Sequence, residues 1–260
     1  MMRALSTSAS GMRAQQVFVD TIAHNLANVN TTGFKRGRVE FQDLLYQVVQ
    51  PNASQSAGSD LKPIQVGHGV RLADIRQIFT QGPTQVTGNA LDMAVNGDGF
   101  FRVEMADGTY AYTRDGSFAL SSEGQVITSG GLSVAPGFEL PEGTTEVSIG
   151  REGEFRVKVA GETDAQELGN VDLYRFANPA GLKAMGNNLF LATESSGEAQ
   201  EGSAGRDGYG SIESGILESS NVSVVEEMIR LIEAQRAYEL NSKSIQTADD
   251  MLAVAGQLKR

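Results

Sequence analysis

The sequence contains no cysteine and no tryptophan, and it has only two histidines among its 260 residues. Without cysteine, the chain has neither a disulfide framework nor a thiolate metal site. The two histidines, His24 and His68, have no partner at a metal-ligand spacing and do not identify a Ser-His-Asp triad. We therefore predict no metal, no cofactor and no catalytic residue.

Long apolar runs are also missing. The first residues, 1–16, contain no continuous apolar stretch of the kind that forms the centre of a secretory signal. No run approaches the roughly 18 apolar residues that suggest a membrane span. We expect no membrane insertion, and any export from the cytoplasm would need a route without a cleaved signal peptide.

Positive charge is scarce in the middle of the chain. The net charge is −11, and residues 1–46 together with residues 221–260 sum to about +1, so the middle carries all of the excess acid. A nucleic-acid-binding protein needs a basic face, and an anionic membrane surface repels an acidic one. We therefore expect no nucleic acid as a partner.

Both ends of the sequence have helical periodicity. Apolar residues recur at intervals of seven, which is typical of helices that pack against other helices. Ser223 and Glu226 form a capping box that predicts where the second helix begins. The first helix is expected to end near Asn28. The two predicted stripes consist of Leu5, Met12, Val19 and Leu26 at the N-terminal end, and Val224, Leu231, Tyr238, Ile245 and Leu252 at the C-terminal end.

The C-terminal helix is predicted to be the longer of the two. If the helices pair side by side, part of the longer apolar stripe stays uncovered, and burial of each apolar side chain is worth about 1.5–3 kcal/mol. A second copy of the same chain could cover it. Contacts of this head-to-tail kind do not close into a ring but build a helical filament.

The middle of the sequence is typical of antiparallel β-structure. Apolar and polar residues alternate over 101–105, a turn is expected at Asp107-Gly108, and alternation resumes over 110–112. Val147 and Ile149 are predicted to face residues 155–159 across a glycine-containing turn. This regular spacing predicts a hairpin-rich domain.

We therefore predict an α+β chain in which the terminal helices pair as a coiled-coil core and a β-domain is inserted between them. Residues 50–60 lack core-forming side chains, and residues 197–215 contain six glycines, so both stretches indicate connectors. The predicted organisation is an N-terminal helical segment over 1–46, an extended connector over 47–69, a β-domain over 70–214 and a C-terminal helix within 215–260.

Four stretches resemble the bacterial flagellar axial proteins, the family of rod, hook and hook-associated proteins. They are NLANVNTTGFKR from Asn25, ALDMAVNGDGFF from Ala90, YTRDGSFALSSEGQVIT from Tyr112, and SNVSVVEEMIRLIEAQRAYELNSKSIQTADDML from Ser220. Together the resemblance extends over nearly the whole chain. The residues that carry the terminal motifs are Asn25, Asn28, Thr32, Gly33, Phe34, Lys35, Gln235, Arg236 and Asn241.

The resemblance implies a structural subunit without enzymatic activity. Length and the connector Gln50–Val70 are most similar to those of the distal rod members, which implies a rigid helical tube that transmits torque from motor to hook across the periplasm. The implied partners are further copies of the chain, proximal rod proteins, hook protein, the peptidoglycan and outer-membrane ring proteins, and the flagellar type III export apparatus.

Within the first motif, each residue type has a predicted physical role. Asn28, Asn30 and Gly33 tolerate capping or left-handed geometry and so can end the helix. Phe34 can pin the returning chain to an apolar surface. Lys35 and the arginine after it are expected to lie near the C-terminal end of the helix, where positive charge is favourable.

Other interpretations stay open at this point. A hook or proximal rod subunit would have the same class of structure at another position in the axis. A secreted adhesin or binding module could use a coiled-coil stalk to display the β-domain. A wall-cleaving hydrolase would need two facing carboxylates, and the sequence identifies no such pair.

Overall fold

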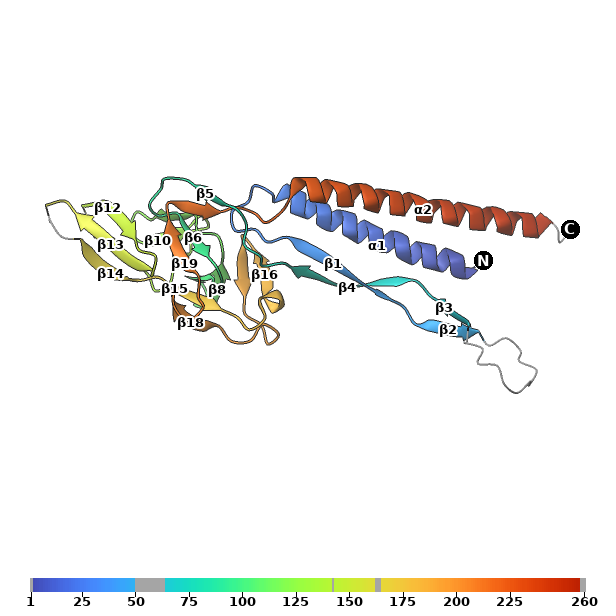
Figure 1. Ribbon diagram of the computed structural model, residues 1–260, viewed down its shortest axis with the longest axis horizontal. Helices are drawn as coiled ribbons and strands as arrows, with labels where there is room; N and C mark the ends of the chain where they lie inside the picture. Colours follow the sequence, from blue (N-terminus) through green and yellow to red (C-terminus); the bar gives the residue numbers. More distant parts are fainter. Residues whose placement is uncertain (1, 50–63, 142, 162–164, 258–260) are drawn as a thin grey trace. The chain divides into compact units, whose positions relative to one another are not determined.

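The structure is a computed structural model, which describes residues 2–49, 64–141, 143–161 and 165–257. The chain is α+β (Figure 1) and divides into two compact units. Unit 1 comprises Met1–Leu26, Gly37–Arg76 and Ser223–Arg260, and unit 2 comprises Ala27–Arg36 and Gln77–Val222. Most of the predicted connector, residues 50–63, lies outside the described residues.

Unit 1 contains both helices and a two-stranded ribbon. Its first helix ends one residue before Asn28 and its second begins directly after Ser223, so both predicted boundaries are confirmed. The ribbon pairs β1 with β4 and, antiparallel, β2 with β3. The elements are α1 (Met2–Ala27), β1 (Gly37–Asp43), β2 (Tyr46–Val49), β3 (Ile64–Gly67), β4 (Val70–Gln77) and α2 (Val224–Gln257).

The ribbon packs against one side of α1. The ring of Phe18 meets the ring of Phe41 edge to face, with centroids 6.1 Å apart. Further along the same helix, Ser10 Oγ accepts a hydrogen bond from Val70 N at 3.3 Å. The ribbon therefore covers part of the helix surface that would otherwise face water.

Unit 2 is built almost entirely of antiparallel strands. Its largest sheet has the order β16-β17-β8-β7-β11-β10-β9, and β12, β13 and β14 form a second sheet. Three further pairs are β15 with β18, β19 with β6, and β20 with β5. The strands are β5 (Thr84–Val86), β6 (Met93–Asn96), β7 (Phe101–Glu104), β8 (Tyr110–Thr113), β9 (Phe118–Leu120), β10 (Val126–Thr128), β11 (Ser133–Val134), β12 (Thr144–Ile149), β13 (Glu154–Val159), β14 (Gln166–Asn170), β15 (Asp172–Arg175), β16 (Lys183–Gly186), β17 (Leu189–Leu191), β18 (Gln200–Ser203), β19 (Ser211–Ser214) and β20 (Ile216–Glu218), with a 3₁₀ turn at Pro179–Gly181.

The predicted hairpins are confirmed. β7 pairs with β8 so that Val103 lies opposite Ala111, and β12 pairs with β13 so that Val147 lies opposite Val157. The sheet is apolar on both faces near β7 and β8. Phe101, Val103 and Ala111 enter the main core, whereas Tyr112 belongs to an aromatic cluster on the other side.

Two hydrophobic clusters stabilise unit 2. The main cluster contains residues of the largest sheet and of the β12–β14 sheet. It also includes Phe138, from the connection between β11 and β12, whose ring stacks on that of Phe155 with centroids 4.8 Å apart. The second cluster is largely aromatic, with rings meeting edge to face, which is a favourable geometry for aromatic pairs. Its buried members are Phe100, Tyr112, Tyr174, Phe176, Leu182 and Phe190.

The prediction that residues 197–215 form a connector is wrong. This segment contains β18 and β19, which pair with β15 and β6 respectively. Its glycines serve turns and close packing: Gly205 has φ +75°, and a Cβ on Gly202 would lie 2.3 Å from the ring of Tyr209. Glycine content alone did not distinguish a tightly packed turn region from a flexible linker.

Among the described residues, neither helix is long and apolar enough to cross a membrane.

Candidate functional site

The NLANVNTTGFKR motif leaves α1 through a tight turn. Thr31 donates its backbone N–H to the carbonyl of Asn28 at 3.2 Å, and its hydroxyl donates to Asn28 Oδ1 at 3.1 Å. Gly33 adopts the left-handed conformation, φ +66°, as predicted, and a Cβ there would lie 2.5 Å from Asp115 N. Glycine is therefore required at this position for two separate reasons.

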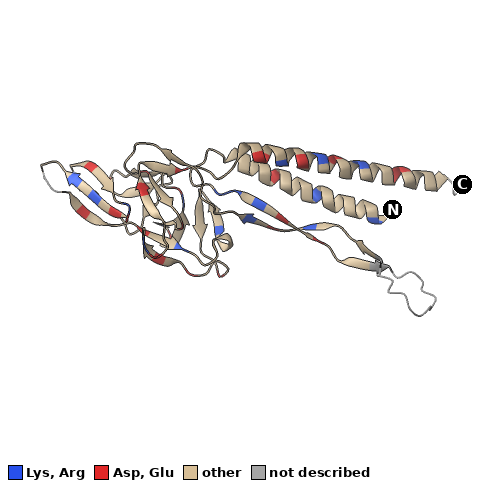
Figure 2. Ribbon diagram, in the orientation of Figure 1, with Lys and Arg blue, Asp and Glu red and all other residues tan. Residues whose placement is uncertain are grey.

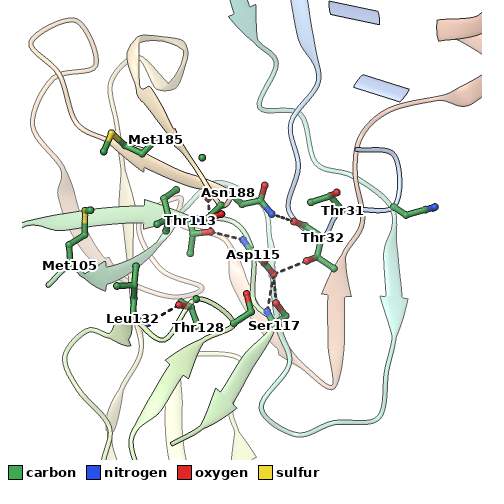
Figure 3. A pocket seen from close by; sticks show the side chains of 16 residues that line it. Thr31, Thr32, Met105, Thr113, Asp115, Ser117, Thr128, Leu132, Met185 and Asn188 are labelled. Carbon is green, nitrogen blue, oxygen red and sulfur yellow. Dashed lines mark hydrogen bonds between the residues drawn. The ribbon is translucent and has the colours of Figure 1, made fainter. Parts of the chain in front are cut away.

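Side chains shown in Figure 3 fix the turn to the rest of unit 2. Thr32 Oγ1 donates to Asp115 Oδ1 at 2.9 Å, and Asn188 Nδ2 donates to the carbonyl of Thr32 at 2.8 Å. Asp115 Oδ1 also accepts from the hydroxyl of Ser117 at 2.7 Å. These bonds hold the motif against the β8–β9 and β16–β17 turns.

A cavity of about 640 Å³ lies beside this turn, within unit 2 (Figure 3). Hydroxyl and amide side chains dominate its lining, with Met105, Leu132 and Met185 among the apolar members. Among the described residues that line it, Asp115 is the one with a charged side chain, and its Oδ1 is already bonded to Thr32 and Ser117. The lining offers neither a nucleophile with a base nor a pair of carboxylates.

A buried ion cluster lies at the end of the motif. Lys35 Nζ is 2.5 Å from Glu218 Oε1, and Arg114 Nη1 is 3.5 Å from Glu218 Oε2. The three residues are between 1% and 3% exposed. Lys35 also donates to the carbonyl of Thr80 at 2.9 Å, and the backbone N–H of Gly82 donates to Glu218 Oε1 at 2.8 Å.

The cluster holds two cations against one carboxylate. Burial is the main cause that lowers the pKa of Lys35, with attraction by Glu218 opposing it and repulsion from Arg114 adding to it. Burial likewise lowers the pKa of Arg114. Arg114 Nη2 compensates part of its lost hydration by donating to the carbonyl of Gly97 at 2.7 Å. Because Glu218 faces both cations, it is the residue on which the cluster depends.

The predicted role of Lys35 beside the C-terminal end of α1 is wrong. Its side chain points into unit 2 and pairs with Glu218, which is far away in the sequence. Phe34, in contrast, is buried as predicted. The sequence pattern identified a cation next to a helix end, but only the fold reveals a carboxylate partner from the other end of the chain.

Asn221 adds hydrogen bonds among the three stretches of unit 2 that meet at the ion cluster, which are those around Lys35, Thr80 and Glu218. Its Oδ1 accepts from the backbone N–H of Arg36 at 2.7 Å, and its Nδ2 donates to the carbonyls of Ile78 at 2.8 Å and Thr80 at 3.1 Å. Each stretch continues directly into unit 1, at Gly37, Arg76 and Ser223. The ion cluster and Asn221 thus hold together the three segments of unit 2 that continue into unit 1.

In unit 1, α1 and α2 contact each other along a seam of small and polar residues. The hydroxyls of Ser8 and Ser244 are 3.2 Å apart, and Gly11 lies against the side chain of Asn241. Asn25 Nδ2 donates to Glu227 Oε2 at 3.2 Å. From Ser8 to Asn25 the sequence number rises along α1 by as much as it falls along α2 from Ser244 to Glu227. This is the pattern of antiparallel helices in one register.

The seam ends in a buried polar group. Asn25 forms two hydrogen bonds with the backbone of Gly37, each 2.9 Å long, and its amide also reaches Glu227. Arg230 Nη1 lies 3.5 Å from Glu227 Oε1. Polar groups within a helix interface favour one register over others, since a shifted register leaves them unpaired. Asn25, a residue of the family motif, is therefore part of the helix seam.

The predicted apolar stripes flank this seam. The structure places the four α1 residues in half-buried positions, together with Leu231 and Ile245 of α2. Tyr238 is 47% exposed, and Val224 and Leu252 are 37% and 36% exposed. Of the motif residues on α2, Gln235 and Arg236 are exposed and Asn241 lies in the seam. The residues buried on the α1-facing side of α2 are Glu227, Ala234 and Ala248.

Sequence reasoning missed Arg114, Glu218, Asn221 and Glu227. One signal was available for Glu227: together with Ala234, Asn241 and Ala248 it recurs at intervals of seven, offset from the apolar series. A search for apolar residues alone overlooks such a series. Nothing in the local sequence around Glu218 indicates that its side chain is buried.

Three family models match the chain. They are "Flagella basal body rod protein" over residues 5–35, "Flagellar hook protein FlgE/F/G D1 domain" over residues 94–157 and "Flagellar basal body rod FlgEFG protein C-terminal" over residues 213–258. The first match ends at Lys35 and the third includes Glu218, so the buried ion pair joins the two terminal matches.

Curated relatives match over the full length. The chain is 50% identical to the flagellar basal-body rod protein FlgG of Borreliella burgdorferi, with all of both chains covered. It is 44% identical to the protein of the same name from Caulobacter vibrioides, with 99% of this chain and all of that one covered. The corresponding Bacillus subtilis protein is 38% identical, again over all of both chains.

Proposed function

Because the chain belongs to the family of flagellar basal-body rod proteins, we propose that it is a structural subunit of the distal rod. It assembles with further copies of itself into a rigid helical tube, which transmits torque from the motor to the hook across the periplasm. Its activity is packing, and it carries out no chemical reaction.

The observation that carries this proposal is the surface of α2. Large apolar side chains stay exposed along this helix in the isolated chain, among them Val225, Ile229, Leu240 and Val254. Exposed apolar patches of this kind on a soluble chain mark surfaces that other molecules cover. An open assembly of identical chains would bury them.

The predicted organisation gives each part of the chain a role in that tube. Residues 1–46 and 215–260 form the axial core through their helices, which pair as a coiled coil. Residues 47–69 act as an extended connector, and residues 70–214 form the outer β-domain. The contacts between Ser8 and Ser244 and between Asn25 and Glu227 support the pairing of the terminal helices.

Torque transmission needs a subunit that does not yield under load. The Lys35–Glu218 ion pair and the hydrogen bonds of Asn221 support this role, because they join stretches of unit 2 that would otherwise be independent loops. Buried hydrogen bonds and ion pairs restrict the relative movement of the stretches that they join.

The partners follow from this position. The tube joins proximal rod proteins at one end and hook protein at the other, and it turns inside the peptidoglycan and outer-membrane ring proteins. The subunit reaches the periplasm through the flagellar type III export apparatus, without a cleaved signal peptide.

The test is deletion of the coding sequence in its host, followed by electron microscopy of extracted basal bodies. We expect short rods without hooks, and we expect the intact chain supplied in trans to restore full rods with hooks. Complete rods bearing hooks in the deletion strain would assign the chain to another position or another class, with a hook subunit, a proximal rod subunit or an adhesin as the candidates to test next.

A further inference from the structure

The cavity beside the turn of the NLANVNTTGFKR motif is large enough for a small ligand, and the proposed function assigns it no role. Its volume is about 640 Å³. Small-molecule sites in proteins occupy roughly 300–1,000 Å³. All of its lining residues belong to unit 2, so a ligand there would be held by one folded unit.

The two sides of the cavity differ in polarity. Met105, Leu132 and Met185 lie on one side in Figure 3, whereas Thr32 and Asp115 lie on the other. Met185 is 48% exposed, so its thioether is accessible to a ligand. A molecule that fits both sides has an apolar face and an edge that is rich in hydrogen-bonding groups.

The turn between β16 and β17 holds two amide side chains at the cavity. Asn187 and Asn188 both have a left-handed backbone, with φ +53° and +58°, which is the geometry of a two-residue type I′ hairpin turn. Asn188 donates its amide to the carbonyl of Thr32 at 2.8 Å. The side chain of Asn187 is exposed and makes no hydrogen bond within the described part of the chain. The turn therefore presents a free amide from a fixed backbone.

Two further lining groups have hydrogen-bonding capacity to spare. Asp115 Oδ1 accepts all of the hydrogen bonds that this carboxylate receives from described residues, and Oδ2 receives none of them. Thr128 Oγ1 accepts from the backbone N–H of Leu132 at 3.1 Å, which leaves its hydroxyl proton available. The cavity thus offers a carboxylate acceptor, a hydroxyl donor and, at Asn187, an amide that is both donor and acceptor.

The charge of the lining disfavours anionic ligands. Asp115 is the one charged side chain among the described lining residues, and a carboxylate repels phosphate and carboxylate groups. Basic side chains of unit 2 lie elsewhere, for example Arg156 and Lys158 on β13 (Figure 2). Nucleotides, sugar phosphates and acidic sugars therefore do not match this cavity.

The hydrogen-bonding groups disfavour two further classes of ligand. A wholly apolar molecule would take water from the hydroxyl and amide groups without replacing it, at a cost of about 1–3 kcal/mol for each group. An extended peptide is recognised through a row of main-chain hydrogen bonds along a strand edge. The free groups here are side chains from separate turns, and they do not form such a row.

We propose that this cavity binds an uncharged saccharide. Sugar hydroxyls donate to Asp115 Oδ2 and accept from the amide of Asn187 and the hydroxyl of Thr128. The C–H face of the sugar ring packs on the thioether of Met185, which removes apolar surface from water. Saccharide binding needs only unit 2 of one copy, so this inference goes beyond the proposed function and does not rest on it.

The first experiment measures binding to the monomeric full chain by saturation-transfer difference NMR, which detects weak ligands. The probes are trisaccharides of similar size: maltotriose and the N-acetylglucosamine trimer, which are uncharged, trigalacturonate, which is anionic, and the glucosamine trimer, which is cationic. We expect an uncharged trisaccharide to bind at millimolar concentration and trigalacturonate to fail to bind.

Three results of this experiment would overturn the proposal. One is the absence of binding by both uncharged trisaccharides. Another is tighter binding of the glucosamine trimer than of either uncharged probe, since the site would then recognise a cation. The last is binding of a capped Ser-Thr-Gly peptide in the absence of saccharide binding, which would indicate a peptide site.

The second experiment tests the assigned contacts with conservative variants. Asp115→Asn keeps the oxygen that accepts from within the chain and replaces Oδ2 by an amide nitrogen. Asn187→Gly removes the amide and keeps the left-handed backbone. Each should weaken saccharide binding by about tenfold. Asp207 is the control position, because it is exposed, has φ +50° and lies outside the cavity, and both Asp207→Asn and Asp207→Gly should bind as the intact chain does.

Thermal unfolding of every variant separates lost contacts from lost folding. Equal affinities in the variants at Asp115, Asn187 and Asp207 would place the saccharide elsewhere and overturn the proposal. If a cavity variant unfolds early, Met185→Ala replaces it, with Leu120→Ala as its control, since both side chains are 48% exposed. Only Met185→Ala should weaken binding, and equal affinities for this pair would also refute the site.

The purified chain gives this result without any rod. Complete rods with hooks in the deletion strain would therefore remove the proposed function and leave saccharide binding in place. Absence of binding would remove the saccharide site and leave the rod subunit in place.

Discussion

The two units of this chain differ in where they keep their apolar side chains. Unit 2 encloses them in two clusters, in which residues such as Phe101, Phe155 and Leu173 are fully buried. Unit 1 buries few large apolar residues, such as Ile22, beside small or polar ones, including Ala234 and Glu227, and it leaves many large apolar residues of α2 accessible. Unit 2 therefore has an apolar core of its own, whereas the exposed apolar surface of α2 in unit 1 is what the proposed assembly would cover.

The largest change in the free energy of unfolding is expected from a substitution in the ion cluster of unit 2. Glu218→Ala leaves Lys35 and Arg114 as buried cations without a counter-charge, which should cost about 3–5 kcal/mol. The measurement is urea unfolding of the monomeric full chain, monitored by near-ultraviolet circular dichroism. Lys35→Met is the matched variant, and its cost should be smaller because Glu218 and Arg114 still neutralise each other. Equal costs would contradict the central role of Glu218.

A second comparison tests the core directly. Phe155→Ala removes a fully buried ring that stacks on Phe138, and we expect a loss of about 3–5 kcal/mol in the same unfolding experiment. Ile229→Ala, in unit 1, should change the stability of the monomer by less than about 0.5 kcal/mol because its side chain is half exposed. Similar losses for both variants would show that the units are not built differently.

Gly33→Ala tests the turn where the chain enters unit 2. The left-handed backbone and the contact with Asp115 N should together cost about 1–3 kcal/mol. Gly130→Ala is the control, since the nearest atom to its added Cβ would be Thr128 Oγ1 at 3.8 Å. If thermal unfolding shows equal shifts for the two variants, Gly33 has no special conformational role.

A smaller effect concerns pH. Because burial lowers the pKa of Lys35 below its ordinary 10.5, the unfolded chain binds this proton more tightly than the folded chain over the window just below 10.5. Stability contributed by this group therefore rises with pH through that window, and the cost of burying the charge is fully present below it. The difference in unfolding free energy between the intact chain and Lys35→Met should change in this direction, and a constant difference would contradict the assignment.

The mildest perturbation addresses the seam of unit 1. Ser8→Cys with Ser244→Cys should form an intramolecular disulfide on oxidation, detected by mass spectrometry, because the two hydroxyls are 3.2 Å apart. Ser8→Cys with Met251→Cys should not, since that pair is about 10 Å out of register along the helix. Efficient bonding in both variants would mean that the helices slide.

Local patterns in the sequence were sufficient for much of the fold. The helix ends near Asn28 and Ser223 and the β7–β8 hairpin follow from capping residues, turn residues and alternation, all of which act over a few positions. The site residues of the ion cluster could not be predicted in the same way. Lys35 and Glu218 meet only because the whole of unit 2 folds between them.

The seam of unit 1 shows a further limit of pattern reading. Apolar periodicity drew attention to Leu231 and Tyr238, whereas the contacts with α1 are made by Asn241, Ser244 and Glu227. Close helix packing uses small residues, and register uses polar ones, so neither stands out in a search for hydrophobic stripes.

Unit 1 is assembled from the two ends of the chain, and this has a consequence for the order of events after synthesis. The contacts of Ser8 with Ser244 and of Asn25 with Glu227 can form only after nearly the whole polypeptide has been synthesised. Contacts between such distant residues form late, after the local hairpins of unit 2. A product that ends before Val224 would lack α2 and, with it, Glu227 and Ser244, which contact α1.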